Sequence, residues 1–176
     1  MAQNINSKEH WDNRWVISPS RSKKCEKIIC RMVEPNLSVL DIGCGGGYLL
    51  KILKDRCTVY GIDISSVSID LLKISGIDGE IWDAENMDRF NKLFDIVICS
   101  HTLEHITDDI KLIKNIRRIT KKYAIFAVPN NCIGPEEEPE HQRIYTKESL
   151  TELLFPHFKV IEDFSNGNHL ILKCSI

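Results

Sequence analysis

A turn with four glycines in five positions, at 43–47, is the first feature of this sequence that suggests a binding site. It follows an apolar run at 39–42 that is typical of a buried strand, and a helical pattern begins at Tyr48. Glycines carry no Cβ atom, so the backbone of such a turn can approach a ligand closely and adopt positive φ angles. Asp41 precedes the turn and Asp63 ends the next strand-like run, whereas no Lys or Arg stands directly beside the turn. We therefore expect a ligand with a positive charge rather than a phosphate.

Two nucleotide-binding motifs can be compared with this turn. A P-loop for phosphate requires Lys followed by Ser or Thr after the glycines, and no Lys stands there. The dinucleotide motif Gly-x-Gly-x-x-Gly, aligned at Gly43, requires glycine where the chain has Tyr48. An NAD-linked oxidoreductase is therefore an alternative interpretation that Tyr48 and the acidic surroundings disfavour.

A second group of reactive side chains is His101, Glu104 and His105, in the order His-x-x-Glu-His. This order matches the inverted zinc-peptidase motif, which needs both histidines on one face of a helix. Here His101 follows a strand-like run by one residue, so we expect it in a turn, with its imidazole diverging from that of His105. The sequence favours coincidence over zinc, and we predict no metal site.

Apolar runs of strand length alternate with helical patterns, which predicts an α/β fold with a doubly wound, mostly parallel sheet. The seven expected strands are at 38–43, 58–64, 80–82, 94–99, 123–128, 159–163 and 169–175, and the helices between them are at 48–54, 67–74, 106–119 and 147–154. Too few residues join the last two strands for a crossover, so we expect a C-terminal antiparallel hairpin at one edge. Thr146 is a candidate N-cap for the last helix, and a further helix is expected at 20–33.

Length and composition limit the class of protein. We expect a single domain over 1–176, with 1–36 as an N-terminal lid and helix segment and 37–176 as the core. The 23 basic and 25 acidic residues leave a net charge of −2, which gives no general attraction to nucleic acid or to anionic membranes. The seven cysteines form no Cys-x-x-Cys pair, as in proteins of a reducing compartment. No apolar stretch approaches the roughly 18–20 residues that span a bilayer. We expect a soluble, cytoplasmic protein.

The glycine turn and several later segments together resemble the class I S-adenosylmethionine-dependent methyltransferases of the small-molecule type. The first motif of that family has the form Asp-x-Gly-x-Gly-x-Gly, as at 41–47 here. The other segments that carry the resemblance are 60–65, 83–84, 94–97, 100–105 and 141–146, in the family's order along about residues 37–176. The resemblance implies a Rossmann-like methyltransferase fold and S-adenosylmethionine as the methyl donor.

The resemblance also implies which residues hold the methionyl part of that cofactor. Asp41 would face its ammonium group, and the turn formed by Gly43, Cys44, Gly45 and Gly47 would let the backbone pass beside it. The alternative for Asp41 is that it only caps or solvates the end of a strand.

The adenosine part is expected on the following strand ends. Asp63 would accept hydrogen bonds from both ribose hydroxyls, and Ile64 would pack against the adenine. Asp83 would accept from the adenine amino group, while the Ala84 amide would serve a ring nitrogen. Ser100 would border the sulfonium. A structural role at a strand end is the alternative for Asp63, and core packing is the alternative for Ile64 and Ala84.

The acceptor side is less defined by sequence. His101, His105 and His141 are candidate bases, and His101 and His141 are also candidate substrate contacts. A base is needed only if the acceptor must lose a proton, so each histidine can equally have a structural role. Trp11 and Trp15 share one face if they lie on a helix. They form either a lid, with Trp15 on the cofactor and Trp11 on the substrate, or a packing contact of the N-terminal segment.

We therefore predict in-line methyl transfer from S-adenosylmethionine to a small-molecule acceptor by a monomer or homodimer. A catalytically silent binding module with the same fold is the alternative. The Asn-Pro-Pro-Tyr/Phe segment of enzymes that methylate DNA bases is absent after the fourth strand, where residues 100–103 stand instead. About 35 residues precede the first strand, and no inserted domain offers surface for a macromolecular substrate. The sequence does not indicate which type of atom accepts the methyl group.

Overall fold

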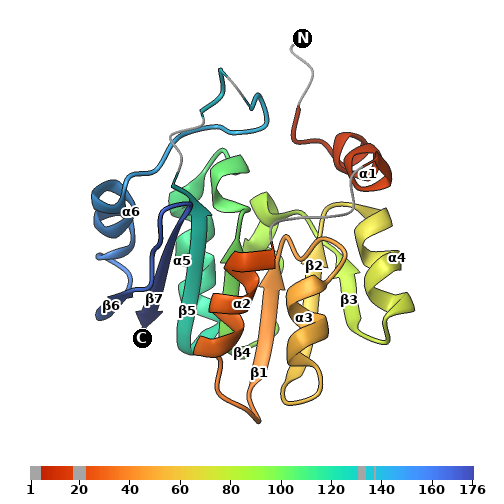
Figure 1. Cartoon of the computed structure of the whole chain (residues 1–176), viewed down its shortest axis with the longest axis horizontal. Coiled ribbons are helices and arrows are strands. Elements are labelled where there is room, and N and C mark those ends of the chain that lie inside the picture. Colours follow the sequence, from red (N-terminus) through yellow and green to blue (C-terminus); the bar gives the residue numbers. More distant parts are fainter. Residues whose placement is uncertain (1–4, 18–22, 131–133, 137) are drawn as a thin grey trace.

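The chain forms one seven-stranded sheet with helices on both faces in a computed structural model, which describes residues 5–17, 23–130, 134–136 and 138–176 (Figure 1). The strands are β1 (Ser38–Ile42), β2 (Thr58–Asp63), β3 (Asp78–Ile81), β4 (Phe94–Ser100), β5 (Thr120–Pro129), β6 (Val160–Asp163) and β7 (His169–Ser175). The helices are α1 (Lys8–Ile17), α2 (Lys23–Met32), α3 (Tyr48–Leu53), α4 (Ser66–Ile74), α5 (Asp109–Ile119) and α6 (Lys147–Leu154), with short 3₁₀ turns η1 (Ala84–Arg89) and η2 (Leu103–His105).

The sheet has the strand order β3-β2-β1-β4-β5-β7-β6. The first five strands are parallel, and β7 pairs antiparallel with both β5 and β6. The predicted doubly wound sheet with a C-terminal antiparallel hairpin is confirmed. The chain leaves β1 toward β2 on one side and returns to β4 on the other. In open α/β sheets this reversal creates a crevice at the carboxyl ends of the strands, where ligands bind.

Two hydrophobic clusters cover the two faces of the sheet. One joins the strands to α2, α3 and α4, and the other joins them to η1, α5 and α6. Successive strand residues alternate between them, as Val39 does with Leu40 and Ile96 with Val97. Because both faces are buried, β1 and β4 are fixed in register by packing, and their carboxyl ends form a firm support for the loops that follow.

Several element boundaries differ from the expected ones. Helix α5 begins at Asp109 rather than at 106, because η2 precedes it and the Asp108 side chain caps it by accepting from the Lys111 N–H (2.9 Å). The expected N-cap of α6 is confirmed, since the Thr146 hydroxyl accepts from the Ser149 N–H (3.1 Å). Strand β5 starts at Thr120, three residues before the expected start.

The N-terminal segment contains two helices instead of one. The helix expected at 20–33 is present as α2, and its expected residues 20–22 lie outside the described part of the chain. Helix α1 lies beside α4 (Figure 1) and is attached there by Asp12. The Asp12 carboxylate accepts hydrogen bonds from the hydroxyls of Ser65 (2.7 Å) and Ser66 (3.1 Å), at the start of α4. Among the described helices, none is long and apolar enough to cross a membrane.

Candidate active site

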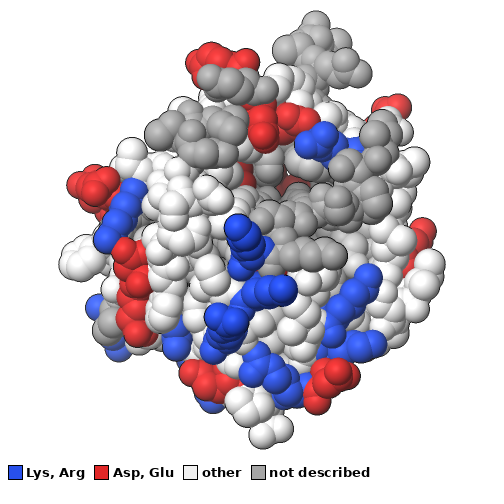
Figure 2. Space-filling view, in the orientation of Figure 1, with Lys and Arg blue, Asp and Glu red and all other residues white. Residues whose placement is uncertain are grey.

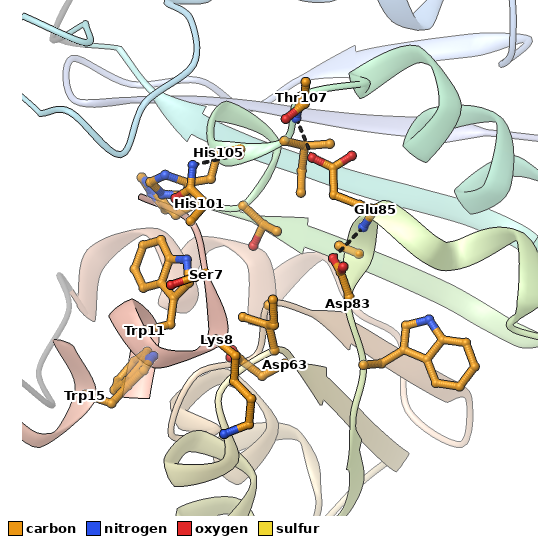
Figure 3. Close-up of a pocket in the computed structure, with 17 residues that line it drawn as sticks. Ser7, Lys8, Trp11, Trp15, Asp63, Asp83, Glu85, His101, His105 and Thr107 are labelled. Atoms are coloured by element: carbon orange, nitrogen blue, oxygen red, sulfur yellow. Dashed lines mark hydrogen bonds between the residues drawn. The ribbon is translucent and has the colours of Figure 1, made fainter. Parts of the chain in front are cut away.

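A cavity of about 350 Å³ opens at the carboxyl ends of β1, β2 and β4. One end is lined by Asp63, Ile64 and Asp83, which follow β2 and β3, and the other end by His101 and His105, which follow β4. Figure 3 shows the histidines and the aspartates on separate sides of this space, with α1 alongside. The sheet topology thus brings together side chains that are up to 42 positions apart between Asp63 and His105.

The glycine turn has the geometry that its sequence predicts. Gly43, Gly45 and Gly47 all have positive φ angles, of 71°, 53° and 74°. A Cβ atom at Gly43 would overlap the Thr102 side chain, and one at Gly45 would overlap the indole of Trp15. The backbone therefore requires glycine here both for its conformation and for the close approach of its neighbours.

Asp63 connects the glycine turn to the start of α4. One carboxylate oxygen accepts from the Gly45 N–H (2.8 Å) and the other from the Ser65 N–H (2.9 Å). The side chain is almost fully buried yet contributes to the cavity wall. Because a carboxylate offers about four lone-pair sites, two accepted bonds leave capacity for the hydroxyls of a ligand. Asp63 therefore has the structural role and also borders the cavity.

The next acidic residue has a similar double position. The Asp83 carboxylate accepts from the Glu85 N–H (2.9 Å) and from the side-chain amide of Asn86 (2.9 Å), so it caps η1. It lines the cavity together with Ile64 and Ala84. The structure therefore brings the three residues predicted around the adenine to the wall of one cavity.

A second cavity of about 150 Å³ lies on the other side of Trp15. Asp41, Cys44 and Ser100 line it, and Asp41 is only 4% exposed. Trp15 and Gly43 line both cavities. The two cavities are therefore chambers that adjoin each other at Trp15 and Gly43.

The histidines on the acceptor side surround a buried carboxylate. Glu104 is 1% exposed, with one oxygen 3.4 Å from His101 Nδ1 and 4.0 Å from His105 Nε2. The expectation that these two imidazoles diverge is wrong. His101 does lie in a turn, with a positive φ of 54°, and η2 then brings His105 back toward the same carboxylate.

The environment of Glu104 favours its ionised form. Burial raises the pKa of the carboxyl, but the contact with the His101 ring and the attraction of His105 and His101 outweigh it, so the pKa is lowered. His101 Nε2 also lies 3.1 Å from His169 Nδ1, and burial together with His101 lowers the pKa of His169. A buried negative charge is therefore held among aromatic nitrogen atoms at the edge of the cavity.

His141 stands behind this cavity rather than in its wall. It is 5% exposed, its ring centre lies 5.0 Å from that of His105, and its Nε2 lies 3.2 Å from the Glu138 carboxylate. His101 and His105 line the cavity directly. Of the three candidate bases, His141 is therefore the one that does not border the cavity itself but contacts His105, which does.

Helix α1 and the residues before it cover the acceptor side. The indole of Trp11 meets the His105 ring edge to face, with centres 5.0 Å apart. The Asn6 side-chain amide donates to the backbone oxygens of His105 (3.1 Å) and Glu140 (2.9 Å). Trp11 and Trp15 both line the large cavity, so the predicted pair of aromatic residues lies over the site.

The sequence is similar to a known protein family and to several of its members. A model of the methyltransferase domain matches residues 19–157. The chain belongs to the methyltransferase domain family. A ubiquinone biosynthesis O-methyltransferase of Coxiella burnetii is 34% identical over 113 residues, which are 60% of this chain and 47% of that protein. The chain spans about half the length of the curated relatives it matches.

Solved structures share the fold of this methyltransferase-family chain. Magnesium protoporphyrin IX methyltransferase of Synechocystis, solved with bound S-adenosylmethionine, has a TM-score of 0.69 at 16% identity, covering 97% of this chain and 92% of that one. A TehB-like methyltransferase of Corynebacterium glutamicum has a TM-score of 0.70 at 17% identity, covering 95% and 96%. The sheet described above is therefore the Rossmann-like fold of methyltransferases.

Some site residues of this methyltransferase-family chain could not be found by motif. His169 contacts the site from β7, Asn6 lines it from the N-terminal segment, and Asp12 attaches α1 to the start of α4 beside it. A signal for His169 existed, because an antiparallel β7 must begin at the edge where β5 ends, and His169 pairs with Pro129. Asn6 and Asp12 carry no comparable pattern.

Proposed function

We propose that this chain transfers a methyl group from S-adenosylmethionine to a hydroxyl group of a small molecule. The observation that carries the proposal is the cavity of about 350 Å³ with Asp63 and Asp83 at one end and His101 and His105 at the other. The first end suits a nucleoside, and the second end suits a group that must lose a proton. The O-methyltransferases among the relatives and the S-adenosylmethionine bound to a structural neighbour support the same assignment.

The two chambers would determine which way round the cofactor lies. The ribose hydroxyls would donate to Asp63, and the adenine would lie by Ile64, Asp83 and Ala84. The methionyl part would follow the glycine turn into the smaller chamber, where Asp41 attracts its ammonium group. Trp15 lines both chambers, so its aromatic ring would lie near the sulfonium, and a cation is attracted to the face of such a ring.

The reaction would be an in-line displacement at the methyl carbon. The acceptor oxygen forms a bond to that carbon while the carbon–sulfur bond breaks, and the electron pair stays on sulfur in S-adenosylhomocysteine. Alignment of the two reactants supplies roughly 7–11 kcal/mol in well-oriented cases. The hydroxyl proton would pass to the histidine cluster next to Glu104, of which His101 and His105 line the cavity. Proton transfer of this kind contributes about 10²–10⁴-fold.

The surroundings of the site agree with a small, soluble acceptor. Acidic and basic side chains both occur across the face shown in Figure 2, in keeping with the net charge of −2. The six free cysteines among the described residues are buried, which suits a reducing compartment such as the cytoplasm. We propose that the chain acts there as a monomer or homodimer.

A calorimetric titration with S-adenosylhomocysteine tests the cofactor assignment. Wild-type protein should bind it with one site per chain, whereas Asp63→Ala should bind it far more weakly. Asp70→Ala removes an exposed carboxylate on α4 and is the matched control, which should bind as the wild type does. Absence of binding to the wild type would contradict the proposal.

A labelled-methyl assay then separates the enzyme from a silent binding module. Incubation with methyl-labelled S-adenosylmethionine and a panel of small phenols, alcohols, amines and thiols should transfer label to a hydroxyl compound. Transfer to amines or thiols alone would contradict the choice of acceptor. Cofactor binding without transfer to any member of a broad panel would favour the binding module.

A further inference from the structure

The carboxylate of Glu104 is buried without the hydrogen bonds that such a group normally receives. Both of its oxygens lie out of contact with solvent, and neither accepts a hydrogen bond within the part of the chain that the structure describes. Buried carboxylates are normally paired, hydrogen-bonded or bound to a metal ion. The nearest charged or chargeable groups are histidines, of which His101 and His105 approach the same oxygen.

The backbone partner of His105 indicates which of its ring nitrogens carries the proton. His105 Nδ1 lies 3.0 Å from the backbone oxygen of Glu140. A carbonyl oxygen only accepts hydrogen bonds, so Nδ1 carries the proton, and in the neutral ring Nε2 then has a lone pair. A backbone carbonyl that fixes the tautomer in this way is a common partner of metal-bound histidine.

The separation between His105 Nε2 and Glu104 is informative. At 4.0 Å it is too long for a hydrogen bond, so a proton does not link the two atoms. A gap of this length leaves room for a cation between the carboxylate oxygen and the ring nitrogen. Ligand atoms on a tetrahedral zinc ion, at about 2.1 Å from the metal, are roughly 3.4 Å apart. The distance of 4.0 Å between His105 Nε2 and the Glu104 oxygen would need to shorten by well under about 1 Å to reach that separation.

A third donor completes the arrangement. One ring nitrogen each from His105 and His141 and one oxygen of Glu104 all lie within 4.8 Å of one another. His141 is 5% exposed and reaches this group from the segment before α6, whereas Glu104 and His105 belong to η2. Nitrogen and carboxylate donors in this number suit divalent transition metals better than magnesium or calcium.

A neighbouring group of possible ligands is less suitable. Cys25, His101 and His169 also have donor atoms within 4.8 Å of one another. There, however, the two histidine nitrogens are 3.1 Å apart and form a hydrogen bond with each other. Burial raises the pKa of the Cys25 thiol to about 12, so it keeps its proton. This second group is satisfied without a metal ion.

We propose that Glu104, His105 and His141 bind a divalent first-row transition metal ion, with Zn²⁺ as the probe. Three protein ligands leave at least one coordination position for water or an oxygen ligand. His105 is shared between this site and the wall of the large cavity, which places the ion beside the acceptor. Its effect on the reaction rests on the proposed function: a bound cation lowers the pKa of a coordinated hydroxyl and so eases transfer of the proton to His101. Metal binding itself does not depend on that function.

Titration of metal-free, tag-free protein tests the proposal. Chelator-treated protein is titrated with Zn²⁺ by calorimetry and with Co²⁺ while the visible d–d absorption is recorded. One ion per chain is expected, with an intense tetrahedral Co²⁺ spectrum. Glu104→Gln, His105→Asn and His141→Asn should each weaken binding by at least about 10–100-fold. His157→Asn, in the segment after α6, is the control and should bind as the wild type does.

The remaining outcomes are distinguishable. Circular dichroism and thermal melts establish that each variant is folded. A folded wild type that takes up no stoichiometric ion overturns the proposal and leaves Glu104 as a metal-free carboxylate among histidines. Binding that is lost in His169→Asn but kept in His141→Asn places the ion in the neighbouring group and also overturns it. Binding of Zn²⁺ without any binding of S-adenosylhomocysteine supports the metal site and contradicts the proposed function alone.

Discussion

The two ends of the large cavity are built in different ways. At the proposed cofactor end, Gly43, Asp63 and Asp83 lie at or just after the carboxyl ends of three neighbouring strands, and their positions follow from the sheet topology. At the acceptor end, four separate segments meet: the residues before α1, the turn after β4, the loop before α6 and the start of β7. The first end depends on backbone geometry, and the second depends on how side chains from distant segments pack.

The contrast separates the features that the fold itself provides from those that depend on this particular chain. The glycine turn and the strand-end carboxylates can hold one cofactor in many proteins, because the same strand order places them every time. The histidine group around Glu104 depends on the positive φ of His101 and on the chain segments that cover it. We therefore expect cofactor binding and acceptor chemistry to respond separately to mutation.

The largest effect should come from breaking the cofactor end. Asp63→Ala removes the acceptor for the Gly45 and Ser65 N–H groups and, in the proposed function, for the ribose hydroxyls. Hydrogen bonds to a charged group contribute about 1.5–3 kcal/mol each, so affinity for S-adenosylhomocysteine should fall by about 100-fold or more. Calorimetry measures the change. Asp63→Asn should fall between the variant and the wild type, and unchanged affinity in Asp63→Ala would assign Asp63 to structure alone.

The next largest effect should come from the acceptor end. His101→Asn removes a cavity-lining imidazole but suits the positive φ at this position, which asparagine tolerates. The turnover number should fall by about 10²-fold, the low end of proton-transfer contributions, while S-adenosylhomocysteine binds within about two-fold of the wild type. Steady-state kinetics and calorimetry on the same samples check this. A parallel loss of cofactor affinity would show that the two ends are not separate.

A smaller effect is expected from Asp12, which attaches α1 to the start of α4. Asp12→Asn weakens the acceptor of the Ser65 and Ser66 hydroxyls and should lower stability by about 1 kcal/mol, as loss of a helix cap does. Burial raises the pKa of Asp12, but hydrogen bonds from Lys8, Ser65, Val67 and Ser66 outweigh it, so the pKa is lowered.

The pH dependence of Asp12 follows from that direction. A carboxylate with a lowered folded pKa contributes stability above its unfolded pKa of about 3.9, and the contribution is lost as the pH falls toward the folded value. The difference in unfolding free energy between wild type and Asp12→Asn should therefore be full near neutral pH and shrink below about pH 4. Chemical denaturation across that range measures it. A difference that grows on acidification would contradict the assigned contacts.

The smallest effect on the site should come from a region outside both ends. Thr146→Ala removes the N-cap of α6 and should lower the unfolding free energy by about 1 kcal/mol. Affinity for S-adenosylhomocysteine should stay as in the wild type, since no cavity residue changes. A thermal melt and a titration together show whether stability loss alone can imitate a defect at either end.

The sheet and the positions of the glycine turn and of the strand-end carboxylates could be predicted from the sequence, because all of them depend on local patterns. Strand runs, the glycines of 43–47 and the carboxylates after β2 and β3 are all short-range signals. The acceptor end was predicted only in part. The backbone N–H of His101 donates to Ala127, and its ring contacts His169. Neither contact is indicated by residues that are neighbours in sequence. The ring therefore lies near Glu104, contrary to the expectation from the sequence. Asn6 and Asp12 act across more than 50 positions of sequence, where spacing carries no information.

The most direct test of the account is one set of titrations with S-adenosylhomocysteine. Wild type, Asp63→Ala and His101→Asn are measured by calorimetry under the same conditions. The account predicts one site per chain in the wild type, a loss of about 100-fold or more in Asp63→Ala and an affinity within about two-fold of wild type in His101→Asn. No binding by folded wild-type protein, or equal affinity in all three, would contradict it.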